Sequence, residues 1–268
     1  MNVTLNNSSV DSPEHWRLEM MLSADSLDVF ALRQVGENKV ISAHLPLDPA
    51  AASRAAAFEE AAYSNPMLLM PFGKVDFVVN GGFTLVSPSD VQIEDINALF
   101  PAQDDSVTLS TAIDARDQLI FRLDRATYNF LQRTFDNARL THSLAVLAQY
   151  FSRQSRLGNN SKMFVDIEER TMNVLVFNQF GLAMASCFDC PDINDAAYYA
   201  LASANTAGLD FTNDEIRVVG TSDRRAALMP ILRKFARNVM PAIFPASAFS
   251  NDSAMSAPFT LAILPLCE

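Results

Sequence analysis

Residues 162–189 read KMFVDIEERTMNVLVFNQFGLAMASCFD, and this stretch decides the fold that the sequence predicts. Its three apolar runs lie at 163–167, 172–177 and 182–188. Two polar turns, at 168–170 and 178–181, separate them. Short runs rich in Val, Ile and Phe between polar turns are typical of β-strands, so we expect a three-stranded meander. The runs are nearly continuous in apolar character, which indicates a sheet covered on both faces.

The same order of elements occurs earlier in the chain. Apolar runs at 16–21, 27–32 and 39–45 predict a first meander, and an Ala- and Glu-rich segment at 49–63 predicts a helix after it. The second meander is followed by a predicted helix at 194–207, which Gly208 closes. The two copies share almost no residue identities, so the repetition is one of architecture rather than sequence.

The remaining segments predict further strands and helices. We expect strands at 68–70, 75–80, 83–86, 119–123, 139–141, 215–219 and 259–264, and helices at 89–100, 125–135, 143–154 and 223–240. Strands and helices that alternate in this way favour an α/β chain with mixed sheets. We expect an N-terminal lobe at 14–137 and a C-terminal lobe at 138–268, preceded by a frayed polar tail at 1–13.

Composition excludes several classes of partner. The chain has 268 residues, of which 49% are apolar, so it can build a sizeable core. Its net charge is −11, which disfavours binding to nucleic acid or to anionic membrane surfaces. No apolar run approaches the roughly 20 residues of a membrane helix, and the start lacks the basic and apolar parts of a secretory signal. We therefore expect a cytoplasmic protein.

Cysteine and histidine patterns give no catalytic or metal site. Three cysteines are an odd number, which argues against a disulfide framework, and Cys187 and Cys190 form a lone CxxC without a completing ligand. We expect both to be reduced thiols without metal. The three histidines are far apart in sequence, and we expect His142 to be structural. Gly81-Gly82 lacks the Lys-Ser/Thr that a phosphate loop requires.

One turn of the second meander carries a resemblance to a known superfamily. Asp166-Ile167-Glu168-Glu169-Arg170-Thr171 resembles the phosphate-binding hairpin of the actin-like ATPases, whose pattern is Asp-x-Gly-x-x-Thr between two strands. That superfamily includes actin, sugar kinases, heat-shock chaperone ATPases and pilus-assembly proteins. The strand and turn at 215–222 are similar to its adenosine-binding segment, with Gly220 at the turn. The ending at 258–268 looks like a bacterial family of unknown function that is assigned to the superfamily.

The resemblance covers residues 15–268 in pattern. It implies a duplicated, two-lobed fold of the ribonuclease H-like type. It also implies that Asp166, Thr171 and Gly220 are the remnant of a nucleotide site.

Three departures from the superfamily pattern bear on function. Glu168 stands where the hairpin has Gly, the turn at 21–26 has Met21 at the acid position and Ser at the glycine, and Thr221 replaces a second Gly. The glycines allow the backbone to approach phosphates. A carboxylate about 4 Å from a phosphate charge would repel it by roughly 4 kcal/mol at an effective dielectric of 20. Loss of the first acid removes a group that would organise Mg²⁺ and water.

The sequence therefore predicts a pseudo-ATPase without a cofactor, which acts by binding another protein or a second copy of itself. Two alternatives stay open. The chain could be a divergent ATP-binding protein or weak Mg·ATPase that uses Asp166, Thr171 and Gly220, or it could be an unrelated α+β binding domain. The sequence does not name a partner.

Overall fold

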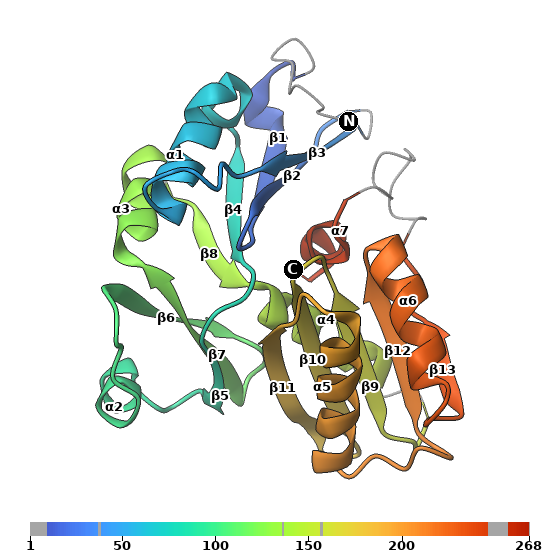
Figure 1. Cartoon of the computed structure of the whole chain (residues 1–268). Helices are drawn as coiled ribbons and strands as arrows, with labels where there is room; N and C mark the ends of the chain where they lie inside the picture. Colours follow the sequence, from blue (N-terminus) through green and yellow to red (C-terminus); the bar gives the residue numbers. More distant parts are fainter. Residues whose placement is uncertain (1–9, 37–38, 136, 156–157, 246–256, 268) are drawn as a thin grey trace.

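The computed structural model describes residues 10–36, 39–135, 137–155, 158–245 and 257–267, and two five-stranded sheets dominate it (Figure 1). The first sheet has the order β3-β2-β1-β4-β8 and the second β11-β10-β9-β12-β13. In each, three strands form an antiparallel meander and the last two run parallel to its first strand. The predicted α/β fold of mixed sheets, each built on a meander, is confirmed.

The bounds of nine of these ten strands follow the sequence-based expectation closely, and β13 is the exception. The first sheet contains β1 (Trp16–Leu22), β2 (Ser26–Arg33), β3 (Val40–Pro46), β4 (Lys74–Val79) and β8 (Arg139–His142). The second contains β9 (Lys162–Ile167), β10 (Thr171–Asn178), β11 (Gly181–Asp189), β12 (Glu215–Gly220) and β13 (Asn238–Pro241). All side chains of β1 and β9 are buried, because helices cover both faces of the central strands.

Strand register makes the two sheets equivalent residue by residue. Leu22 pairs with Leu27 and Val79, and Ile167 pairs with Met172 and Gly220. The turn that follows is closed by the same backbone hydrogen bond in each sheet, from Ser23 to Ser26 and from Glu168 to Thr171, both 2.9 Å. Ser23 and Glu168 therefore hold equivalent positions, and so do Met21 and Asp166.

A third, smaller sheet lies between β4 and β8 along the chain. Its order is β5-β7-β6, with β5 (Thr84–Pro88), β6 (Ser106–Ala112), β7 (Asp117–Asp124) and the short helix α2 (Ile93–Leu99) (Figure 1). The sequence reading missed β6, whose first residue was expected to be in a loop. Its side chains are at best half-buried, so it carries little of the apolar signal by which buried strands are recognised.

Helices cover the sheets, and the residues that precede α1, α3 and α5 cap those three helices. The helices are α1 (Arg54–Ser64), α3 (Arg125–Thr134), α4 (Ser143–Ser155), α5 (Ile193–Thr206), α6 (Ser222–Leu232) and α7 (Phe259–Ile263). Ser53, Asp124 and Asp192 each accept a backbone N–H of the following turn, which satisfies donors that a helix start leaves free. Within the described residues, no helix is long and apolar enough to cross a membrane.

Several expected elements are corrected by the structure. Residues 259–264 were expected to be a strand, but 259–263 form α7, because a short run that is buried all round fits either element. Residues 68–70 were expected to be a strand, but Pro66 starts a 3₁₀ helix, Pro66–Leu69. The helix expected at 223–240 ends at Leu232, and β13 follows.

The start of the described chain and strand β8 both belong to the first lobe. Residues 1–9 of the expected frayed tail lie outside the described residues, whereas Val10 is buried in the core of the first lobe. The expected division at 137 and 138 stays a prediction. β8 nevertheless pairs with β4, so the first sheet takes its last strand from beyond that division.

One apolar core lies within the first lobe, and another joins the two lobes. Trp16 is fully buried in the first lobe, and its indole N–H donates to the Asp11 carbonyl at 2.9 Å. A further apolar cluster contains side chains from both lobes, including Met21 of β1 and Phe164 of β9. Phe151 of α4 stacks on Phe164, with ring centres 3.9 Å apart. The lobes therefore share a continuous core around α4.

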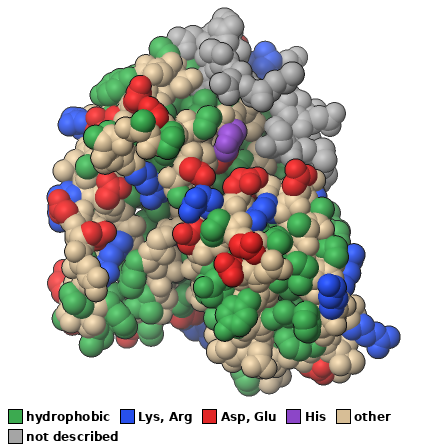
Figure 2. Space-filling model, viewed as in Figure 1, with side chains coloured by type: hydrophobic (Ala, Val, Ile, Leu, Met, Phe, Trp, Pro, Cys, Tyr) green, Lys and Arg blue, Asp and Glu red, His purple; other side chains and the backbone are tan. Residues whose placement is uncertain are grey.

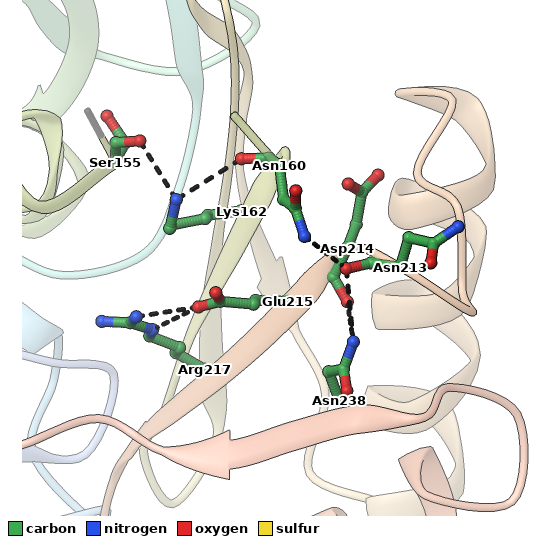
Figure 3. A network of polar contacts seen from close by, with 8 residues as sticks. All are labelled: Ser155, Asn160, Lys162, Asn213, Asp214, Glu215, Arg217 and Asn238. Atoms are coloured by element: carbon green, nitrogen blue, oxygen red, sulfur yellow. Dashed lines mark hydrogen bonds and ion pairs between the residues drawn. The ribbon is translucent and has the colours of Figure 1, made fainter. Parts of the chain in front are cut away.

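The starts of β9, β12 and β13 are joined by polar contacts at the end of the second sheet (Figure 3). The Lys162 ammonium donates to the carbonyls of Ser155 and Asn160, at 3.3 and 3.4 Å. The side-chain amide of Asn238 donates to the Asn213 and Asp214 carbonyls. These contacts stabilise the end of the sheet at which β9, β12 and β13 begin.

Candidate site between the two lobes

The turns at the ends of the central strands enclose a cavity of about 590 Å³. Its wall includes the β1–β2 turn (Ser23–Ser26), the β9–β10 turn (Glu168–Thr171) and the β12–α6 turn (Gly220–Ser222). These are the segments that the resemblance predicted as the two phosphate turns and the adenosine turn. The duplicated register brings them together, because each turn follows a strand that ends at the same edge of its sheet.

The three predicted site residues occupy different places around this cavity. Thr171 and Gly220 line it, but Asp166 lies behind the wall and is only 2% exposed. One Asp166 carboxylate oxygen accepts hydrogen bonds from Asn173 and Thr260, both at 3.4 Å. Burial raises the pKa of Asp166 to about 6 despite these bonds. Asp166 therefore contacts the interior of the protein rather than the cavity.

Gly220 is required by packing alone. Its φ is +111°, and a Cβ atom at this position would lie 1.9 Å from the Ile167 carbonyl oxygen. The N–H of Thr221 donates to the same oxygen at 3.0 Å. No larger residue fits between β12 and β9 at this point, so the glycine is explained without a nucleotide.

Glu168 places a carboxylate at the glycine position of the hairpin. The side chain is 9% exposed and lines the cavity. Burial raises the pKa of Glu168 well above its usual value, and the charges of Asp166, Asp28 and Glu169 raise it further. The Arg224 guanidinium holds the turn through the Glu168 backbone carbonyl, at 3.3 Å, and does not neutralise the carboxylate. Acidic side chains therefore gather at this turn of the cavity wall.

The sequence reading missed an acid and a histidine that face each other in the first meander. His44 Nδ1 lies 2.7 Å from an Asp28 carboxylate oxygen, and both residues line the cavity. The Asp28 carboxylate raises the pKa of His44 above 6.5. The two residues are 16 positions apart, so only the antiparallel register of β2 and β3 could have shown that they meet.

Asn80, which the sequence reading also missed, joins the two turns. Its side-chain amide donates to Ser23 Oγ at 3.2 Å and to Thr171 Oγ1 at 2.9 Å. Its carbonyl oxygen accepts from Ser143 Oγ at 2.8 Å and from the Asn173 amide at 3.3 Å. This buried network spans both lobes directly beneath the cavity. An Asn that ends a strand before Gly81-Gly82 was the available signal, although nothing in sequence identified its partners.

The other candidates from the sequence are His142, Cys187 and Cys190, and burial shifts the pKa of each. Burial lowers the pKa of His142 to about 4, and one ring nitrogen lies 3.2 Å from the Gly81 carbonyl oxygen. Burial also raises the pKa values of Cys187 and Cys190 to about 12 and about 11. Thiols of this kind are poor nucleophiles at neutral pH. Among the described residues, no group of three or more His, Cys, Asp or Glu side chains could hold a metal ion.

A second cavity of about 900 Å³ lies in the first lobe. It is lined by Phe83, Leu99 and Phe100 and by the guanidinium groups of Arg54 and Arg122. Leu99 and Phe100 are 72% and 46% exposed, so both apolar side chains are open to solvent at this cavity. The Arg122 guanidinium lies 4.2 Å from the centre of the Phe83 ring.

Two meander-based sheets of equal order, with their turns facing one cavity, define an actin-like ATPase fold, as the resemblance predicted. The chain belongs to the family described as protein of unknown function (DUF3822), whose model matches residues 6–239. No curated protein matches the sequence.

Solved structures agree on the fold. A crystal structure from Bacteroides thetaiotaomicron, a protein with actin-like ATPase fold and unknown function, is similar with a TM-score of 0.80 and 22% identity. The similarity covers 94% of this chain and 96% of that one. The PilM–PilN type IV pilus biogenesis complex is similar with a TM-score of 0.61 and 9% identity, over 94% and 98% of the chains. At these identities the likeness concerns fold alone.

Proposed function

We propose that this protein is a pseudo-ATPase of the actin-like fold, which does not turn over nucleotide and acts by binding another protein or a second copy of itself. Glu168 carries the proposal. Its buried carboxylate lines the cavity at the position where the hairpin of active relatives has glycine, and three other carboxylates already raise its pKa. A bound phosphate would add negative charge where negative charge is already unfavourable.

The first turn supports the same conclusion. Met21 holds the position equivalent to Asp166, so the first hairpin has no carboxylate at the position where relatives of the superfamily orient Mg²⁺ and its water. The cavity therefore lacks the acid on one side and adds a carboxylate on the other.

A protein-binding role is supported by the surface of the first lobe. Leu99 and Phe100 expose apolar area at the rim of the larger cavity, and such exposed groups commonly mark interaction sites. The similar PilM structure is a complex with PilN. We place the partner surface of this chain at Leu99 and Phe100.

The nucleotide part is tested by calorimetric titration with Mg·ATP. We expect no binding with a Kd below about 10 µM, which corresponds to roughly −6.8 kcal/mol. Glu168→Gly restores the hairpin pattern, and Glu169→Gly is the matched control, since Glu169 is exposed. Binding that appears only in Glu168→Gly would identify a decayed nucleotide site. Tight binding by the unaltered protein would contradict the proposal.

The interaction part is tested with the double variant Leu99→Ser, Phe100→Ser. Phe235→Ser, which replaces an exposed apolar side chain of the other lobe, is the control. Light scattering across a concentration series measures self-association, and affinity capture from the native cell measures other partners. We expect the double variant to lose the interaction while the control keeps it. Retention by both would move the partner surface elsewhere.

The alternative is a divergent ATP-binding protein or weak ATPase. It is favoured by one observation, namely that Thr171 and Gly220 line one cavity with Asp166 directly behind it. The same titration decides between the two functions. Under the alternative, Asp166→Ala and Thr171→Ala would each weaken binding of Mg·ATP.

A further inference from the structure

Glu168 is a largely buried residue whose side chain lines the cavity. It is 9% exposed, and across the described part of the chain its carboxylate makes no hydrogen bond or ion pair. Burial of a charge without a partner is costly, and native proteins rarely retain one without a reason. The carboxylate lines the cavity between the lobes, so a partner can reach it from that cavity.

The surroundings of Glu168 are more acidic than basic. Asp25, Asp28 and Glu169 line the same cavity, and Figure 2 shows acidic side chains across the middle of this face, between the two sheets. The two arginines of the wall have other contacts. Arg170 lies 3.9 Å from Asp189, and Arg225 donates to the Gly220 carbonyl at 3.4 Å. The cavity therefore favours a positive charge near Glu168.

The rest of the wall decides what kind of cation fits. It is largely apolar, with Met21, Val219, Ala242, Phe244, Pro258 and Phe259. A metal ion is disfavoured because no described cluster of His, Cys, Asp or Glu has the arrangement of a metal site. A volume of about 590 Å³ suits a small organic molecule. Methylene groups would cover the apolar wall while an ammonium group donates to the carboxylates.

We propose that this cavity binds a primary alkylammonium group carried on a short apolar chain, with the Glu168 carboxylate as its counter-ion. The proposal rests on the proposed function, because a nucleotide would compete for the same cavity. The ammonium group can belong to a free alkyl diamine or to a lysine side chain of a partner. Both present the same chemistry to the wall, and separate probes distinguish them.

The test is calorimetric titration at pH 8 with 1,5-diaminopentane and, in a second arm, with N-acetyl-lysine methylamide. We expect at least one probe to bind with a Kd below about 1 mM. 1-Pentanol has the same carbon chain without charge, and it should not bind. Glu168→Gln should weaken binding at least tenfold, whereas Glu60→Gln, at an exposed position of α1 outside the cavity, should change it less than threefold.

Glu168→Gln keeps the volume of the side chain, and thermal unfolding will verify that it folds. Asp28→Asn is the second variant, and it should weaken binding by a smaller factor. Equal binding by the unaltered protein and both variants would overturn the proposal, and so would equal binding of 1-pentanol. If no probe binds with a Kd below about 1 mM, the proposal is also wrong.

Proton release gives an independent readout. The titratable and charged groups around Glu168 are Asp166, whose charge raises the pKa of Glu168, and the other charged or titratable residues that line the cavity, namely Asp25, Asp28, His44, Glu169, Arg170 and Arg225. An ammonium group stabilises the charged form of Glu168, whose pKa is raised in the free protein. Binding should therefore release protons and strengthen as pH rises, and loss of the positive charge of His44 acts in the same direction. Binding that weakens toward high pH, while the probe is still charged, would contradict the assignment.

The two proposals fail in different ways. If Mg·ATP binds with a Kd below about 10 µM in a parallel titration, the proposed function is wrong. If neither Mg·ATP nor any amine binds, the pseudo-ATPase proposal stands and only the assignment of an alkylammonium ligand fails.

Discussion

The two lobes share strand order and register, but their buried acidic side chains differ in whether an arginine pairs with them. In the first lobe, Arg17 lies 2.7 Å from Glu19 and 2.8 Å from Asp76, and all three are almost completely buried. In the second lobe, Asp166 and Glu168 are buried, and no Lys or Arg in the described part of the chain forms an ion pair with either carboxylate. The comparison teaches that a duplicated backbone fixes where side chains point, whereas the chemistry at each position is free to diverge.

The largest expected effect comes from removing the cation of the first lobe. Arg17→Met leaves Glu19 and Asp76 buried with less compensation, and we expect a loss of about 3–5 kcal/mol in the free energy of unfolding. Lys162 holds the equivalent position in the second sheet, and its ammonium donates to the carbonyls of Ser155 and Asn160. Lys162→Met should cost less, about 1–2 kcal/mol. Urea unfolding measures both, and equal losses would break the comparison.

Asp166 should make the second lobe sensitive to pH. Its pKa is about 6 in the folded protein and 3.8 in the reference state, so the folded protein binds the proton more tightly. Its contribution to stability is fully present below about pH 4 and is lost as pH rises through 6, by about 3 kcal/mol at most. Asp166→Asn should flatten the stability curve between these values. Asp189→Asn, on an exposed carboxylate of β11, is the control and should leave the slope in place.

Glycine is needed at one of two equivalent positions. Gly220 in β12 corresponds to Val79 in β4, because each pairs with the last residue of the neighbouring central strand. Gly220→Ala places a methyl group against the Ile167 carbonyl and should cost at least about 2 kcal/mol. Gly82→Ala has a similar φ but open space around the new methyl group, and should cost about 1 kcal/mol. A smaller loss for Gly220→Ala would mean that β12 shifts away from β9.

The smallest expected effect on stability comes from the ion pair of Asp28 and His44, which lines the cavity on the side of the first lobe. Asp28 and His44 face each other across β2 and β3, and Asn173 and Cys187 hold the same register in the second lobe. Because His44 is largely exposed, we expect the pair to contribute only about 0.2–1 kcal/mol. The contribution is present below pH 6.5 and is lost as pH rises through the raised pKa of His44.

NMR titration checks this prediction. His44 should titrate above 6.5, His142 at about 4, and Asp28→Asn should bring the pKa of His44 down. A His44 pKa below 6.5 would contradict the ion pair.

The sequence predicted the fold because the meanders have strong local signals. Apolar runs and polar turns placed the six meander strands to within one or two residues at most ends. The signal failed where it was ambiguous or weak. The buried run at 259–263 fits a helix as well as a strand, and β6 is half-exposed on both faces.

The candidate site was predicted only where it followed a motif. Thr171 and Gly220, which the motif singled out, line the cavity, and their part in a nucleotide site stays a prediction. The position of Asp166 behind the wall depends on how β9 is covered. Asn80 and Asp28 were missed because their partners lie on other strands or in the other lobe. Such contacts arise from register and from the packing of the lobes, and no local pattern reports them.

Trp16 gives the difference between the lobes a practical consequence. It is the sole tryptophan of the chain, and it is buried in the first lobe beside the Arg17 ion pairs. Intrinsic tryptophan fluorescence therefore reports unfolding of the first lobe, whereas far-ultraviolet circular dichroism reports loss of secondary structure in both lobes. Coincident transitions by the two probes would show that the shared core around α4 makes the lobes unfold as one cooperative unit. Separated transitions would reveal a half-unfolded state that no single probe could detect.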